Sequence, residues 1–453
     1  MQLLAVKLEV LLRALASDAN FLNRERVIFK NRRGLFAWCI FDWGNSAFPT
    51  IVTTFIFSAY FTEKIAPDEV IGTTQWGYAI SISAFAVAIF SPIAGAIADH
   101  IGRQRLWLLF FLFFCIVGSA SLWFSEPTNH FVFYTLLVVA IANFCFELSM
   151  VFYNAMLPDL VHPYRIGRWS GIGWGLGYAG GLCCLIIALI FLIDKDFSIF
   201  SLNRQSFEHL RATGPLVAIW MIVFCTPLFF CINDQPKQPV KFHLGVYRGL
   251  LTFFDTIRLW KRQKNIFSFL LARMIYIDGL NTLFAFGGIF AAGTFGFTFE
   301  ELIILGISMN IGAGIGSIVF SFIEERIGPR NLIQSCLFCL IVFGAAALIT
   351  EDKIFFWIIL LGMGLFVGPV QSASRSLMAR LTPINARTEM FGLYAFSGKA
   401  TAFLGPAVLS WVTAMFSSQR AGMATIFIFM GVGLCALRFV KEPAIEDIIV
   451  RQG

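Results

Sequence analysis

Five charged residues, Asp42, Glu147, Asp278, Arg375 and Lys399, each lie within a long and mostly apolar stretch of this chain. On insertion scales, one ionised side chain near the centre of a bilayer costs roughly 2.5–3.5 kcal/mol. Left unpaired, the five would together cost on the order of 12–18 kcal/mol, which exceeds the net stability of a typical protein. We therefore expect them to face one another, a water-filled cavity or a ligand. Acids and bases at this depth favour the binding and passage of a charged solute.

Two of the acids are followed, one helical turn later, by an asparagine. Asn45 follows Asp42 and Asn281 follows Asp278, so that each pair lies on one face of its helix. Such a face is suited to binding a polar solute. It could equally make interhelical hydrogen bonds that fix the position of the helix.

The remaining three charges also allow more than one role. Glu147 stands near the middle of its apolar stretch, where a carboxyl could bind cargo or carry a proton. Arg375 lies close enough to a helix end to extend its guanidinium to the membrane surface. Lys399 lies deeper, and its alternative role is a standing ion pair with Asp278 or Glu147.

The elements that position these residues are expected to be transmembrane helices. Of the 453 residues, 58% are hydrophobic and only 13% are charged, whereas soluble domains have about 25% charged residues. A membrane-spanning helix needs about 20 mostly apolar residues, and strand-like alternation is absent. The sequence therefore predicts an all-α membrane protein with twelve spans, at 35–61, 74–98, 105–125, 131–157, 169–193, 213–233, 267–293, 300–323, 331–350, 354–381, 388–416 and 421–440.

The distribution of basic residues predicts the orientation. With twelve spans, most Lys and Arg residues fall on the side that holds both termini, notably in stretches 1–33 and 234–265 and in the loop with Arg103 and Arg105. Cytoplasmic loops carry this excess, so both termini are predicted to be cytoplasmic. The net charge of +7 is thus an orientation signal, and because the basic residues are scattered over several loops, nucleic acid is not an expected partner.

No cofactor or metal is predicted. The Cys336-x-x-Cys339 pair lies inside an apolar span with no second pair and no nearby histidine, which is typical of buried free thiols. All five histidines fall in loops or at helix ends, so an enzyme active site within the membrane is not expected. The predicted partners are a small-molecule solute, the lipid bilayer and, for energy, protons; the predicted assembly is a monomer.

The chain repeats itself in order. Asp42-x-x-Asn45 recurs as Asp278-x-x-Asn281, and the segment from Gly95 to Arg103 recurs around Glu325, Gly328 and Arg330. The repeats predict two pseudo-symmetric six-helix halves, 34–233 and 266–441, joined by a basic linker, 234–265, with an amino-terminal extension, 1–33, and a tail, 442–453. Two such halves with a site between them at the midplane suit transport by alternating access.

These motifs resemble known families. The loop Gly95-Ala-Ile-Ala-Asp99-His-Ile-Gly102-Arg103-Gln-Arg105 resembles the signature between the second and third helices of the major facilitator superfamily. Phe41-Asp42-Trp43-Gly44-Asn45-Ser46, Phe152-Tyr153-Asn154-Ala155, Gln371-Ser372-Ala373-Ser374-Arg375 and Ser397-Gly398-Lys399 are similar to its vacuole effluxer (autophagy-related) group, also called the unknown major facilitator group. The fungal member of that group releases amino acids from the vacuole, so the resemblance implies a small-solute carrier and suggests amino acids.

The spacing and the resemblance together give the predicted function and sites. We expect a secondary transporter of a small polar, zwitterionic or anionic solute in a bacterial inner membrane, the alternatives being an exporter of drugs or other organic solutes and a transport-inactive sensor. The predicted cargo-binding residues are Asp42, Asn45, Glu147, Asn154, Asp278, Asn281, Gln371, Arg375 and Lys399. Glu147, with Asp42 as the alternative, is the predicted proton carrier. The predicted gating residues are Gly95, Asp99, Gly102, Arg103, Arg105, Glu325, Gly328 and Arg330.

Overall fold

The computed structural model describes residues 32–194, 202–234, 242–258 and 263–443. Residues 1–31 of the predicted extension, part of the predicted linker and residues 444–453 of the predicted tail lie outside the described residues. The described residues include eleven helices that are long and apolar enough to cross a membrane. The predicted first span is a further membrane-length element, but it is interrupted along its length.

That first span consists of α2 (Arg32–Asn45), η1 (Phe48–Phe55), α3 (Phe57–Tyr60) and η2 (Phe61–Ile65). The π-helical segment η1 begins beside Pro49, whose missing N–H cannot continue the α-helical hydrogen-bond ladder. The wider turns of η1 follow directly after Asp42 and Asn45, at the depth where the sequence predicts the site.

Five further spans complete a first group of helices. They are α4 (Glu69–Ile101), α5 (Gln104–Ser121), α6 (Val132–Leu160), α7 (Ile166–Ala188) and α9 (Thr213–Cys231), with the short α8 (Glu208–Arg211) before the last. Small residues let these helices approach closely. At Gly171, a Cβ atom would collide with Ser321 of the second group, so this glycine is required where two helices from different halves touch.

A second group follows α10 (Phe242–Arg258), a helix that packs against α4. Its spans are α11 (Lys264–Phe295), α12 (Phe299–Ile327), α13 (Pro329–Ile349), α14 (Lys353–Leu381) and α17 (Gln419–Ala436), together with one interrupted span, α15 (Arg387–Lys399) and α16 (Leu404–Phe416). Thr298 and Glu301 form a capping box at the start of α12, and Asp352 caps α14, which fixes where these helices begin.

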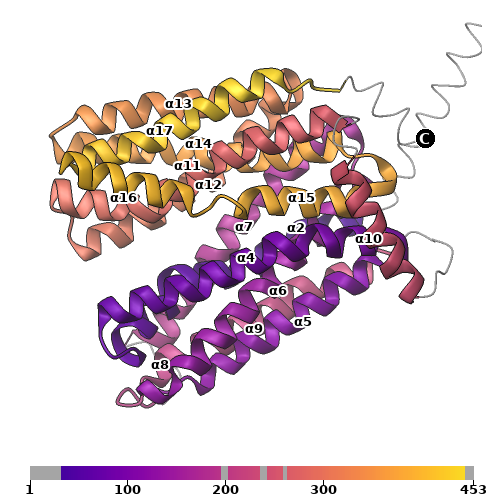
Figure 1. Ribbon diagram of the computed structural model, residues 1–453. Coiled ribbons are helices and arrows are strands. Elements are labelled where there is room, and N and C mark those ends of the chain that lie inside the picture. The colour runs from indigo at the N-terminus through magenta and orange to yellow at the C-terminus, as the bar shows by residue number, and fades with distance from the viewer. Residues whose placement is uncertain (1–31, 195–201, 235–241, 259–262, 444–453) are drawn as a thin grey trace, which may run out of the picture.

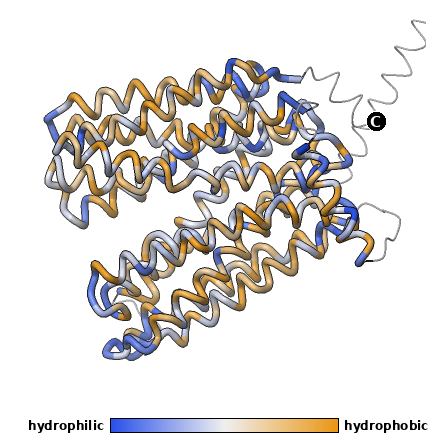
Figure 2. The backbone as a smooth tube through the Cα atoms, viewed as in Figure 1, coloured by the Kyte–Doolittle hydropathy of each residue, from blue (hydrophilic) through white to orange (hydrophobic). Residues whose placement is uncertain are grey.

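The two groups meet at one end of the bundle and diverge towards the other, where α8 and α16 lie (Figure 1). We call the end that carries Arg32 and Lys441 the terminal face, and the opposite end the distal face. The groups touch chiefly where α4 packs on α15 and where α7 packs on α12. Hydrophobic residues cover the sides of both groups, and hydrophilic residues gather at the two ends (Figure 2). This is the expected surface of a helical bundle in a bilayer, and the predicted all-α twelve-span fold is confirmed.

Candidate functional site

A cavity of about 440 Å³ lies between the two groups. Its walls come from α2, η1, α6 and α7 of the first group and from α11, α14 and α15 of the second. The polar and charged residues that line it are Asp42, Asn45, Ser46, Glu147, Asn154, Trp174, Arg273, Asn281, Gln371, Tyr394 and Lys399. Most of the predicted cargo-binding residues therefore meet in a single cavity, although their sequence positions span both halves of the chain.

Arg375 lies against this cavity and is 1% exposed. Its Nη1 donates to Asp42 Oδ2 at 3.0 Å and to Asn154 Oδ1 at 3.2 Å. Its Nε donates to Ser170 Oγ at 3.0 Å, and its Nη2 donates to the Ser170 carbonyl at 2.7 Å. All of these partners belong to the first group, whereas Arg375 belongs to α14 of the second. The guanidinium is thus a hydrogen-bonded link between the halves.

Aromatic rings complete the surroundings of Arg375. The Trp38 and Trp174 ring centroids lie 4.8 and 5.6 Å from its Cζ atom. Tyr153 stacks on Trp38 at 4.6 Å and donates its hydroxyl to the Trp38 carbonyl at 2.9 Å. Aromatic faces attract a cation, and the effect grows when water is excluded. Together with Asp42, they offset the cost of burying this charge.

A second acid–base pair crosses between the groups nearby. Lys399 Nζ lies 2.7 Å from Glu147 Oε1, and the two side chains are 28% and 22% exposed. Lys399 is the last residue of α15, where the helix dipole favours a positive charge. An ion pair with Glu147 was one of the alternative roles that the sequence allowed for Lys399. Both residues of this pair line the cavity, whereas Arg375 of the other pair does not.

Asp278 is placed differently from the other predicted cargo-binding acids, Asp42 and Glu147, which line the cavity. It is 1% exposed and does not line the cavity. Its Oδ2 accepts from the backbone N–H of Gly405 at 2.9 Å, while Oδ1 has no hydrogen-bond partner among the described residues. Gly405 stands at the start of α16, so Asp278 binds the restart of the span that is interrupted after Lys399. The neighbouring Asn281, by contrast, does line the cavity.

Sequence reasoning missed Arg273. This residue lies on α11, lines the cavity and is 8% exposed. Its Nη1 donates to the Tyr394 carbonyl at 2.7 Å and to Ser397 Oγ at 2.6 Å, and its guanidinium lies 3.6 Å from the Tyr394 ring centroid. The sequence contained a signal for this residue, because Arg273 is a charged residue inside the predicted membrane span 267–293.

The terminal face is closed by contacts between the groups. Asp99, near the end of α4, accepts from the backbone N–H groups of Thr388 at 3.2 Å and Glu389 at 2.8 Å, at the start of α15. A carboxylate at a helix N-terminus is favourable both as a cap and against the helix dipole. Gly95 lies one turn earlier, and a Cβ there would overlap the Thr388 carbonyl oxygen. Gly95 and Asp99 therefore allow and hold the close approach of α4 and α15.

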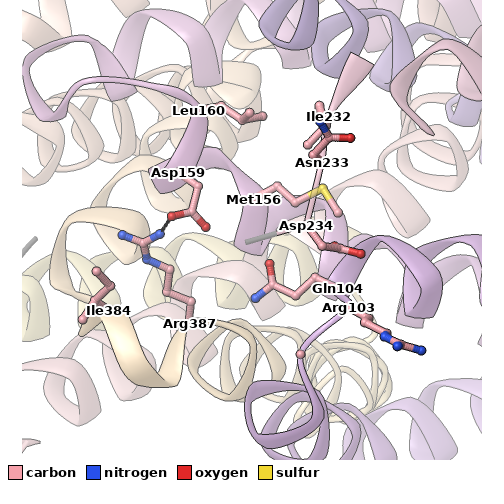
Figure 3. Close-up of a pocket in the computed structure, with 11 residues that line it drawn as sticks. Arg103, Gln104, Met156, Asp159, Leu160, Ile232, Asn233, Asp234, Ile384 and Arg387 are labelled. Atoms are coloured by element: carbon pink, nitrogen blue, oxygen red, sulfur yellow. Dashed lines mark ion pairs between the residues drawn. The ribbon is translucent and has the colours of Figure 1, made fainter. Parts of the chain in front are cut away.

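The contact between α7 and α12 corresponds, in the internal repeat, to the contact between α4 and α15, but it is made by an ion pair. Arg168 Nη2 lies 2.7 Å from Glu325 Oε2, which makes an ion pair between the groups. Another ion pair, between Asp159 and Arg387, borders a surface pocket of about 240 Å³ (Figure 3). In Figure 3, the Arg387 guanidinium faces the Asp159 carboxylate, whereas Arg103 points away from both.

Two other predicted gating residues, Arg105 and Arg330, make hydrogen bonds within their own group. Arg105 Nη1 donates to the carbonyls of Phe229 and Ile232 at 2.9 and 2.8 Å, at the end of α9. Arg330 Nη2 donates to the Arg438 carbonyl at 3.3 Å. Gly102 and Gly328 have φ angles of 78° and 83°, so each ends a helix in a conformation that favours glycine. These residues shape the turns that follow α4 and α12.

Comparison with known proteins gives a consistent result. The model of a family described as "Vacuole effluxer Atg22 like" matches residues 65–444. The uncharacterized MFS-type transporter YxiO of Bacillus subtilis (strain 168) is 26% identical over 423 residues, covering 92% of this chain and 97% of YxiO. Autophagy-related protein 22 of Kluyveromyces lactis is 25% identical over 360 residues, covering 71% of this chain and 70% of that protein.

Solved structures share the fold. The major facilitator proton:xylose symporter XylE superposes with a TM-score of 0.69 at 12% identity, covering 93% of this chain and 98% of XylE. At that identity the likeness concerns the fold alone.

Proposed function

This chain belongs to the Atg22-like vacuole effluxer family, and we propose that it carries a small zwitterionic or anionic solute, such as an amino acid or a related metabolite, by alternating access. It is a multi-pass membrane transporter of the major facilitator type. The observation that carries the proposal is the cavity between the halves, in which acids of the first group meet bases of the second.

The Glu147–Lys399 pair is the part of this arrangement that cargo can reach. An incoming carboxylate competes with Glu147 for Lys399, and an incoming ammonium competes with Lys399 for Glu147. Binding a zwitterion therefore replaces one ion pair by two, without leaving a charge unpaired in the membrane. Asn45, Asn154, Asn281 and Gln371 add neutral hydrogen-bonding groups to the same walls.

We propose that Glu147 also carries the coupling proton, with Asp42 as the alternative. Glu147 is partly exposed to the cavity, whereas Asp42 is held by a buried arginine. Separation of the halves would pull Glu147 away from Lys399 and leave its carboxyl without that charged partner. XylE, which shares the fold, is a proton symporter.

The proposed orientation places the terminal face in the cytoplasm of a bacterium, with the protein in the inner membrane as a monomer. The Lys and Arg excess on that face supports the orientation. In this orientation, the structure corresponds to a carrier that is closed to the cytoplasm. The contacts that close it are those of Asp99 with the start of α15, of Arg168 with Glu325 and of Asp159 with Arg387.

Replacing Asp99 by Asn is expected to slow flux while leaving equilibrium binding of cargo within a few fold. The neutral side chain can still accept a hydrogen bond but loses the charge that favours the N-terminus of α15, an effect of about 0.3–1 kcal/mol. Cargo uptake into proteoliposomes measures the flux. Asp68→Asn is the matched control, because Asp68 also caps a helix, α4, but does so on the distal face through the Ile71 N–H. Normal flux in Asp99→Asn would rule out a gating role.

Replacing Gly95 by Ala is expected to open the terminal face, because the new methyl group would overlap the Thr388 carbonyl oxygen. The backbone N–H groups of Thr388 and Glu389 would then lose their Asp99 acceptor. Hydrogen–deuterium exchange of the peptide that spans residues 386–392 should accelerate. Gly77→Ala, on the same helix with nothing within 4 Å, should leave exchange unchanged. Equal protection in both variants would contradict the proposed role of Gly95.

A thermal-shift screen of the purified full chain against a metabolite panel, followed by uptake of the stabilising solutes into proteoliposomes, tests the proposed function. The expected result is stabilisation by zwitterionic or anionic metabolites and uptake of the same compounds. Stabilisation and uptake confined to bulky organic drugs would indicate an exporter of organic solutes. Stabilisation without uptake of any compound would indicate a transport-inactive sensor.

A further inference from the structure

We infer that Arg273 binds the acidic group of the cargo, and that the cargo is an organic carboxylate rather than an amine or a neutral solute. This inference rests on the proposed transport function and names the residue and charge class within that same cavity. It differs from the arrangement described above, in which an incoming carboxylate competes with Glu147 for Lys399.

Arg273 is the one base lining the cavity that has no acidic partner among the described residues. Arg375 is paired with Asp42, and Lys399 is paired with Glu147. Within the described part of the chain, no carboxylate oxygen lies within 4.0 Å of the Arg273 guanidinium. Arg273 therefore brings to the cavity a positive charge that no ion pair with the described residues offsets. A cationic solute would enter against that charge, whereas an anion would neutralise it.

The hydrogen bonds of Arg273 leave one edge of its guanidinium without a partner among the described residues. The two hydrogen bonds to Tyr394 and Ser397 both come from Nη1. Nε is buried without a partner among the described residues, and Nη2 donates no hydrogen bond to them. Nε and Nη2 form one edge of the planar guanidinium, and two parallel N–H groups on such an edge can bind both oxygens of a carboxylate.

The side chain is also fixed in place before any cargo binds. The Tyr394 ring lies against the guanidinium at 3.6 Å, and the two Nη1 bonds prevent rotation. A group that is already immobilised loses little conformational entropy on binding. Tyr394 and Ser397 both belong to α15, the helix that closes the terminal face. A ligand on Arg273 is thereby connected to the element that must move when that face opens.

The other residues that line the cavity indicate the rest of the cargo. Phe146, Trp174 and Phe391 line the cavity with aromatic surface, and Ile277 lies one turn after Arg273 on α11. Asn281, two turns after Arg273 on the same helix face, supplies a polar group farther along the cavity. These walls suit a carboxylate with an apolar or aromatic body.

Three derivatives of phenylalanine test the charge preference. N-acetyl-L-phenylalanine is an anion, L-phenylalanine is a zwitterion and L-phenylalaninamide is a cation at pH 7. Binding of each to the purified full chain is measured by titration calorimetry. For the wild type, we expect both carboxylates to bind at least tenfold more tightly than the amide, because a hydrogen bond to a charged group contributes enough for such a ratio.

In Arg273→Gln, binding of the two carboxylates should fall roughly tenfold to a hundredfold, and binding of the amide should change less than threefold. Arg273→Lys keeps the charge and should retain part of the affinity, which also guards against loss of folding in the first variant. Arg420→Gln is the matched control, since Arg420 likewise donates to backbone carbonyls, those of Leu348 and Thr350, but lies outside the cavity. Its affinities should equal those of the wild type.

Unchanged carboxylate binding in Arg273→Gln would overturn the inference, as would a wild type that prefers the amide or binds none of the three probes. Failure of the proposed function has a different signature. If the wild type binds the carboxylates through Arg273 but proteoliposomes move no solute, the anion site stands and transport does not. If solute moves and Arg273→Gln retains the anion preference, transport stands and the anion site does not.

Discussion

Replacing Arg375 by Gln is expected to destabilise the protein by about 3–5 kcal/mol, the largest effect that we predict for a single substitution. The side chain is 1% exposed, and its loss leaves the Asp42 carboxylate buried without its cation. The hydrogen bonds to Asn154 and Ser170 weaken at the same time. Thermal unfolding in detergent measures the loss. Because Arg375 links the two groups, the variant should also expose the terminal face.

A second substitution distinguishes an unpaired charge from simple loss of packing. Asp42→Asn combined with Arg375→Gln removes both charges and should recover a large part of the stability lost in Arg375→Gln. Lys353→Gln is the control for an exposed pair, because Lys353 and Glu301 lie 2.7 Å apart with side chains 37% and 32% exposed. That control should cost less than about 1 kcal/mol. A double variant no more stable than Arg375→Gln would show that the ion pair does not carry the effect.

Replacing Glu147 by Gln is expected to abolish gradient-driven accumulation of cargo while retaining exchange of cargo between the two sides of a vesicle. Glutamine resembles the protonated carboxyl in shape and charge but can neither gain nor lose a proton. The 2.7 Å contact to Lys399 would change from an ion pair to a hydrogen bond of one charged partner. Uptake under a pH gradient and counterflow without one, in the same proteoliposomes, measure the two activities.

Glu301→Gln is the matched control for the proton-coupling prediction, because Glu301 also pairs with a lysine at 2.7 Å but lies on the distal face. It should accumulate cargo like the wild type. Accumulation by Glu147→Gln under a pH gradient would refute the assignment. Wild-type transport that ignores the proton gradient would return Glu147 to a cargo-binding or structural role.

The fold could be predicted almost completely from the sequence because a bilayer allows few solutions. Apolar segments of sufficient length must form helices, and their number and the internal repeat indicate two halves. Pro49 and Pro406 are candidate kinks in the first and eleventh predicted spans, but the extent of the interruption at η1 and of the break after Lys399 was not predicted. Hydropathy averages over such breaks, and they depend on contacts such as the one between Asp278 and Gly405.

The site could be predicted only in part. Asp42, Glu147, Arg375 and Lys399 do meet across the two groups, as the cost of burying their charges requires. Which acid meets which base depends on helix rotation and could not be derived from spacing. Asp278 shares the motif of Asp42 yet binds backbone, because the interrupted span offers it a free N–H.

The predicted gating residues were also placed correctly only in part. Asp99 and Glu325 contact the opposite group, whereas Arg105 and Arg330 bind carbonyls of their own group. A basic residue near a helix end can contact the opposite group or bind carbonyls of its own group. Which of these it does depends on which helix C-terminus lies within reach. The sequence motif does not distinguish residues that contact the opposite group from residues that contact their own.

Distances between spin labels on the two faces test alternating access most directly. In a variant without native cysteines, one pair of labels at exposed Tyr164 and Ile384 reports the terminal face, and another at exposed Val70 and Ile354 reports the distal face. We predict that Gly95→Ala lengthens the first distance and shortens the second, whereas Gly77→Ala changes neither. Distances on both faces that stay the same in Gly95→Ala would contradict a carrier whose two halves rock about a central cavity.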